Sequence, residues 1–68
     1  MTVNEIILNA EWINGGINII IKYQDNRGVE HPLAGGVWYS DQVLYWGGYR
    51  ALKMIMNFDE CEAVFYIG

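Results

Sequence analysis

The sequence predicts a small α+β domain of order β-β-β-α-β, an antiparallel meander with one face covered by a single helix and with its last strand beside its first. Three observations predict this class. Apolar and polar residues alternate over 5–13 and again over 17–24, the period of half-buried strands. Turn signals separate these segments, and a helical period follows Ser40. We expect residues 1–68 to form one domain.

The first two expected strands form a hairpin. Residues 5–13 alternate from Glu5 onward, and Asn14-Gly15 follows. Asn-Gly is a strong hairpin signal because both residues tolerate positive φ. Residues 17–24 alternate in the same way and read as the returning strand.

A second turn and an edge strand are expected next. Residues 25–28, Asp-Asn-Arg-Gly, combine side chains that bond their own backbone with a glycine for the left-handed position. The third strand, 29–34, contains Pro32, which cannot donate to a ladder and so indicates an edge position.

The segment from 37 to 57 allows two interpretations. In one, VWYS and VLYW are strands around a tight Asp-Gln turn; in the other, Ser40 or Asp41 caps a helix that runs to about Met56. The helix is favoured because its period separates an inner stripe from a polar side. The inner stripe is Leu44, Gly48, Ala51, Leu52 and Ile55, and the polar side is Gln42, Trp46, Arg50 and Lys53. Gly48 would let the helix approach the sheet, whereas Gly47, at the margin, has no such explanation.

The chain is expected to close with a strand over 61–67, after a turn at 57–60. Its alternation opposes two sets of side chains, namely Cys61, Ala63, Phe65 and Ile67 against Glu62, Val64 and Tyr66.

Size and composition favour self-association. A core of about 3–5 kcal/mol is the usual limit below about 70–80 residues, and the single cysteine, Cys61, excludes an internal disulfide. The chain is nevertheless 53% hydrophobic, more than so short a chain can hide. We therefore expect a homo-oligomer, most simply a dimer.

The net charge bears on the partner. Eight acidic residues against four basic ones give −4, which repels phosphate backbones and favours basic partners. Direct nucleic-acid binding is not expected. The apolar runs are too short to span a membrane, and a soluble, cytoplasmic protein is expected.

Side chains for catalysis are few, so we expect no enzyme, no cofactor and no metal. Ser40 and Thr2 are the only aliphatic hydroxyls, Cys61 is the only thiol and His31 is the only imidazole, and none has the surroundings of an activated nucleophile. The Gly15-Gly16 and Gly47-Gly48 pairs lack the spacing of phosphate-binding loops.

Two surfaces are candidates for binding. Trp46 is expected on the outer face of the helix, with Arg50 four residues on. This pairing is suited to cation-π stacking and is common at protein interfaces. Alternatively, the register differs and Trp46 belongs to the core.

The sheet face away from the helix is expected to mix apolar and acidic residues, namely Ile7, Ile13, Ile20, Val64 and Tyr66 with Glu5, Glu11, Glu30 and Glu62. The expected partner-binding residues are Trp46, Arg50, Tyr45, Trp38, Tyr39, Glu11 and Glu30.

These features favour a non-enzymatic, acidic protein-binding module that docks on a larger basic protein. In size, charge and scarcity of catalytic residues the chain resembles the inhibitors, such as anti-CRISPR and anti-restriction proteins, that phages and mobile elements direct against nucleic-acid-handling enzymes. One alternative is an oligomeric module that stacks a nucleotide or other planar metabolite between protomers, on Trp38, Tyr39, Tyr45 or Trp46. Another is a structural subunit whose only role is assembly.

Overall fold

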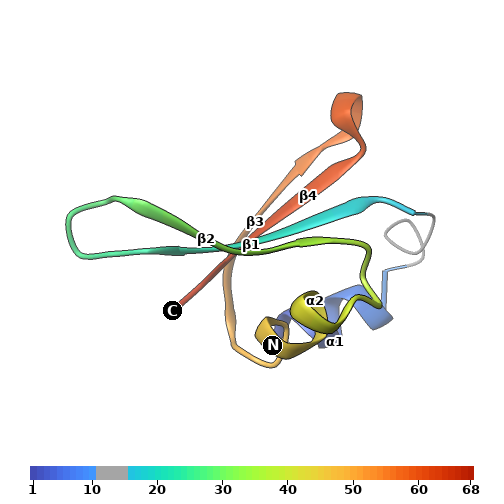
Figure 1. The fold of residues 1–68 in the computed structure, drawn as a ribbon, viewed down its shortest axis with the longest axis horizontal. Helices are drawn as coiled ribbons and strands as arrows, with labels where there is room; N and C mark the ends of the chain where they lie inside the picture. Colours follow the sequence, from blue (N-terminus) through green and yellow to red (C-terminus); the bar gives the residue numbers. More distant parts are fainter. Residues whose placement is uncertain (11–15) are drawn as a thin grey trace.

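A computed structural model describes residues 1–10 and 16–68 and confirms the α+β class. Two short helices and a 3-10 turn accompany a four-stranded mixed sheet (Figure 1). The elements are α1 (Val3–Leu8), β1 (Asn18–Gln24), β2 (Glu30–Gly36), α2 (Asp41–Trp46), β3 (Ala51–Asn57), η2 (Phe58–Glu60) and β4 (Glu62–Ile67).

The strand order is β2-β1-β4-β3. β1 pairs antiparallel with β2 and parallel with β4, and β4 pairs antiparallel with β3. The last strand thus lies beside the first strand of the structure, but the expected meander is replaced by two hairpins joined through a parallel pair. Both helices lie on the same side of the sheet (Figure 1), so no helix of the described residues covers the other side.

The expected strand over 5–13 is wrong at its start, where the chain forms α1. The Thr2 hydroxyl accepts from the Glu5 N–H at 3.2 Å, and the Glu5 carboxylate accepts from the Thr2 N–H at 2.8 Å. This capping box stabilises a helix start. Val3 and Ile7, one turn apart, are both buried by the helix. Glu11, Ile13 and the Asn14-Gly15 hairpin signal lie outside the described residues.

The expected helix over 41–56 is also too long. α2 ends at Trp46, where Gly47 and Gly48 begin a turn, and residues 51–57 form β3 instead. Two successive glycines, each about 1 kcal/mol worse than alanine in a helix interior, favour an end at this point. The hairpin interpretation of 37–46 is wrong as well, because 41–46 is helical.

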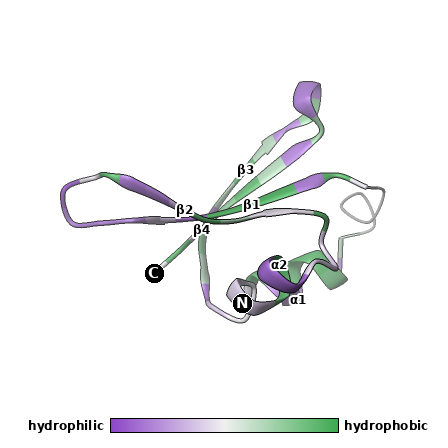
Figure 2. Cartoon of the chain, in the orientation of Figure 1, coloured by the Kyte–Doolittle hydropathy of each residue, from purple (hydrophilic) through white to green (hydrophobic). Residues whose placement is uncertain are grey.

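The core lies between the sheet and the two helices. Ile19 and Ile21 of β1 and Phe65 of β4 are fully buried on this side, against Val3 and Val43 from the helices. Apolar residues concentrate in β1, β4 and α1, and polar ones in the β1–β2 hairpin and η2 (Figure 2). No helix in the described residues is long and apolar enough to cross a membrane.

The strands expected over 17–24, 29–34 and 61–67 are confirmed as β1, β2 and β4, with their ends shifted by at most two residues. The 25–28 turn joins β1 to β2, with Gly28 at φ 83° and the Asp25 carboxylate accepting from the backbone N–H groups of Arg27 and Val29. β2 is an edge strand, and its register with β1 shifts next to Pro32.

Candidate functional site

One candidate surface, called here the α2 aromatic surface, consists of Tyr45, Trp46, Tyr49 and Arg50. The Trp46 ring stacks on Tyr49 at 5.5 Å between centroids and meets the Tyr45 ring edge-on at 5.1 Å. Tyr45 is 67% exposed and Tyr49 46%, and Arg50 follows them on the surface. Tyrosine, tryptophan and arginine are the residues that most often carry binding energy at protein interfaces.

α1 holds this surface in place. The Asn4 side chain donates to the Leu44 carbonyl at 3.1 Å, and its backbone N–H donates to the Gly47 carbonyl at 2.9 Å. The Val3 N–H donates to the Tyr49 carbonyl at 3.2 Å. The first turn of α1 therefore satisfies carbonyls at the end of α2, which a helix end otherwise leaves unpaired.

The two glycines after α2 have the opposite roles to those expected. Gly47 is buried, and a Cβ there would collide with the Asn4 side chain and lie 2.7 Å from the Val43 carbonyl oxygen. Gly48 is exposed, and a Cβ there would meet only the Tyr45 carbonyl at an ordinary 3.6 Å. The close contact is thus between helix end and α1, at Gly47, rather than between helix and sheet at Gly48.

The register of α2 also differs from the expected one. Val43, not Leu44, is the fully buried residue, and Leu44 is 43% exposed. Trp46 is half-buried and packs against the core. Of the two expectations, a core position therefore describes this ring better than a position on the outer face of the helix. Its ring contacts are with tyrosines, whereas the cation-π pair among the described residues is Lys53 over Tyr66, at 4.9 Å.

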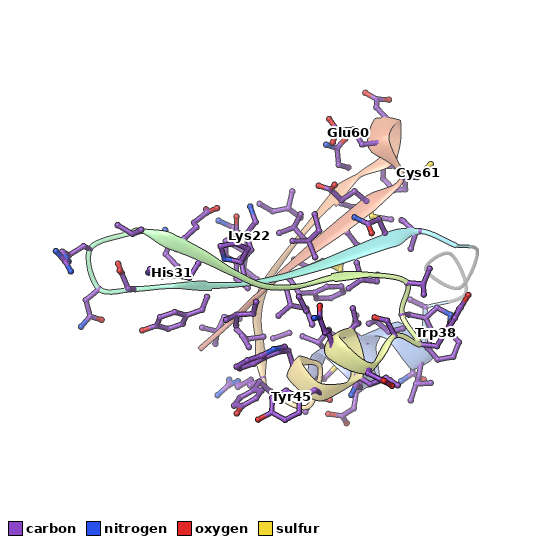
Figure 3. All side chains as sticks on the ribbon, in the orientation of Figure 1. Lys22, His31, Trp38, Tyr45, Glu60 and Cys61 are labelled. Atoms are coloured by element: carbon purple, nitrogen blue, oxygen red, sulfur yellow. The ribbon has the colours of Figure 1, made fainter. Side chains whose placement is uncertain are left out.

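The other predicted aromatic pair lies at the opposite end of α2. Trp38 and Tyr39 pack edge-on at 5.4 Å in the turn before the helix. Figure 3 shows Trp38 and Tyr45 at the two ends of α2, so the predicted aromatic residues form two groups.

The second candidate surface is the open face of the sheet, the face without helices, although its central residues Val64 and Tyr66 are each only 8% exposed. Ile20 is opposite Val64, and Val64 is opposite Ile55, so the three form one apolar row. The next row joins Lys22, Tyr66 and Lys53. The predicted members Ile20, Val64, Tyr66 and Glu62 do share this face, but the α1 residue Ile7 is in the core. Ile55 and Lys53 were missed because their segment was expected to be helical.

Glu30 is engaged within the chain. Its carboxylate accepts from the Tyr66 hydroxyl at 2.9 Å and from the Lys22 ammonium at 3.3 Å. The hydrogen bond from Tyr66, and after it the bond from Lys22, holds the pKa of Glu30 below its usual value. The Glu30 carboxylate in turn raises the pKa of Tyr66. Glu30 therefore stabilises the open face instead of presenting a free carboxylate. Glu11, the other predicted acidic contact, lies outside the described residues.

The residues with catalytic potential are dispersed. His31 stacks on Tyr23 and contacts Asp25 at 3.0 Å in the β1–β2 hairpin, whereas Cys61 follows η2. Figure 3 shows His31 on the β1–β2 hairpin and Cys61 beside η2, well apart from each other. Within residues 1–10 and 16–68, no three His, Cys, Asp or Glu side chains gather as metal ligands would.

No family model matches the chain, and comparisons with curated proteins and with solved structures give no match either. The two surfaces are therefore the features of the chain that bear on its function.

Proposed function

We propose that the chain is a non-enzymatic protein-binding module whose α2 aromatic surface docks on a larger, basic protein. The observation that carries this proposal is the Tyr45–Trp46–Tyr49 cluster, in which a half-buried tryptophan supports two exposed tyrosine rings. Rings held in place by one another and by α1 lose little side-chain entropy on binding. The net charge of −4 favours a basic partner, and an enzyme that handles nucleic acid offers such a surface.

In this proposal the module acts as an inhibitor in the cytoplasm, of the anti-CRISPR or anti-restriction type, by covering a surface that would otherwise contact phosphates. Asp59 and Glu60 of η2 are exposed and add to the acidic field, although Figure 3 shows Glu60 far from α2. The aromatic surface supplies contact energy, while the charge steers the encounter.

Retention of an identified partner tests the proposal. The chain is immobilised, exposed to lysate of its host, and bound proteins are identified by mass spectrometry. We expect a larger basic protein that Tyr45→Ala loses and Phe58→Ala keeps. Phe58 is a matched control because it is an exposed aromatic residue of η2, at the far end of the molecule from α2 (Figure 1). Equal retention by both variants would exclude the aromatic surface as the docking site.

A second proposal is a planar ligand stacked on the same surface. The observation that favours it is the near-parallel stack of Tyr49 on Trp46, at 29°, with nearly half of Tyr49 still exposed. Titration with ATP would then quench tryptophan fluorescence in the unaltered chain and not in Tyr49→Ala. An unchanged spectrum at millimolar ATP would remove nucleoside triphosphates as the ligand.

A further inference from the structure

β3 is an edge strand with apolar side chains on both of its faces. Leu52, Met54 and Ile55 are all exposed, and Lys53 is the only charge between Ala51 and Asn57. An exposed apolar edge with free backbone groups is a template for another strand. Within the described residues, the strand that pairs with β3 is β4, on its inner side.

The stretch of β3 that a partner can use is limited to residues 53–57. At the start of the strand, the Ala51 N–H already donates to the Met1 carbonyl at 2.9 Å, and Thr2 bridges to Arg50. The register with β4 then shifts across Leu52. From Lys53 to Asn57 the pairing with β4 is regular.

We propose that β3 pairs antiparallel with β3 of a second copy of this chain, about a two-fold axis through Ile55. Ile55 would then lie opposite Ile55 of the second copy, Met54 opposite Met56, and Lys53 opposite Asn57. All five residues of the regular stretch find a partner, and the two four-stranded sheets become one continuous sheet.

The position of the axis follows from register and charge. Opposite residues in a continuous sheet share a face, so the axis must pass through a residue and not between two residues. An axis at Lys53 would set two like charges opposite each other, which is unfavourable. An axis at Met54 would extend the pairing over the shifted Leu52 and the occupied Ala51. Ile55 avoids both problems.

Charge complementarity supports a second copy as the occupant. Lys53 and Asn57 lie on the open face, and Asn57 is paired with Glu62 of β4. In the proposed register Lys53 of one copy continues the row formed by Asn57 and Glu62 of the other, which sets opposite charges about two strand spacings, roughly 9.5 Å, apart on each side of the axis. The apolar row of Ile20, Val64 and Ile55 likewise continues into its symmetry mate.

Site-specific cross-linking tests this register. Single cysteines are placed at Ile55, Met54 or Lys53 in a Cys61→Ser background, because Cys61 is exposed and free. At Ile55 the two Cα atoms lie directly opposite, within the roughly 7 Å that a disulfide spans. Met54 is offset from Met54 of the second copy by two residues, and Lys53 from its counterpart by four. At about 3.4 Å per residue, the two Cα atoms are then about 8 Å apart at Met54 and about 14 Å apart at Lys53. Mild oxidation should cross-link Ile55→Cys at least about tenfold faster than Lys53→Cys.

The outcomes separate cleanly. Fast cross-linking at Ile55, to a species of twice 7.8 kDa, supports the axis. Faster cross-linking at Met54 or Lys53, or none at Ile55, overturns it. Circular dichroism melts verify folding of each variant, and a purely monomeric parent chain would overturn the interface without any variant. The α2 aromatic surface takes no part, so loss of partner capture and loss of this dimer are separate results.

Discussion

The two edges of the sheet are built differently. β2 carries Pro32, which has no N–H to offer, a register shift beside it, and the Gly35-Gly36 pair, which has no side chains to pack. β3 has none of these over residues 53–57 and exposes Met54 and Ile55. Natural sheets use prolines, irregular pairing and charges to prevent edge-to-edge association. The β2 edge has this protection, and the regular part of β3 has only Lys53.

This difference indicates a closed assembly. A sheet with two open edges can add copies without limit, whereas a sheet with one open edge stops after a two-fold pairing. A dimer through β3 would leave the two protected β2 edges outermost. In such a dimer the apolar side chains of β3 would be paired without forming an open-ended polymer.

Truncation of a core side chain should lower the stability of the chain most. Phe65 is fully buried between β1 and β3 on the helix side of the sheet. Phe65→Ala should lower the free energy of unfolding by about 3–5 kcal/mol, which is comparable with the whole stability expected at this size. Urea denaturation should find the variant largely unfolded. A cooperative transition at the parent midpoint would contradict this core.

The turn that connects α2 to β3 gives the next largest effect. Gly47→Ala forces a methyl group against Asn4 and the Val43 carbonyl and should cost about 1–3 kcal/mol, as overpacking does. Gly48→Ala has room for its methyl group and should change stability by less than about 0.5 kcal/mol. Paired thermal melts compare them, and the reverse order would show that the close contact is at Gly48.

Breaking the open edge should dissociate the dimer without unfolding the chain. Ile55→Lys places two ammonium groups opposite each other at the axis, and we expect the dimer to weaken at least tenfold, about 1.4 kcal/mol. Val29→Lys is the matched control, because Val29 is a similarly exposed apolar residue in the β1–β2 hairpin. Light scattering should detect dissociation only for Ile55→Lys. Equal dissociation of both variants would point to net charge instead of the β3 edge.

Opening the protected edge should have a smaller effect. Pro32→Val restores an N–H to β2, while the register shift and the glycine pair remain. We expect slight growth of species larger than a dimer at high concentration, measured by dynamic light scattering. Extensive polymerisation would mean that Pro32 alone protects this edge, and no growth would mean that the other features suffice.

The smallest effect concerns the hairpin of the protected edge. The bond from His31, followed by the Val29 N–H, lowers the pKa of Asp25. A lowered pKa in the folded state gives stability above the unfolded pKa of about 3.9, and that stability is lost as pH falls through the folded value. Asp25→Asn should therefore melt with less dependence on pH below about 4. Identical acid profiles would show that Asp25 contributes nothing there.

Much of the sheet could be predicted from local pattern. β1, β4 and the 25–28 turn follow from alternation and turn chemistry, and Pro32 correctly placed β2 at an edge. α1 was missed because its apolar residues also fit a strand period, although the Thr2–Glu5 capping box was present in the sequence.

The open edge could not be predicted, for a physical reason. Residues 51–57 expose apolar side chains on both faces, so they lack the alternation that a strand with one solvated face would have. Projected on a helix, these residues form an apolar stripe, and this stripe favoured the wrong prediction. The helix α2 ends at Trp46, before the segment begins. The row of Lys53, Tyr66 and Lys22 depends on pairing between distant segments, which no local period encodes.

Sedimentation equilibrium of the unaltered chain measures its assembly without any substitution, and a single open edge predicts one defined assembly. We expect a mass that rises with concentration to twice 7.8 kDa and then stays constant. A mass of 7.8 kDa at every concentration up to about 1 mM, which limits any association to about −4 kcal/mol, would contradict it, and so would a mass that rises without a plateau.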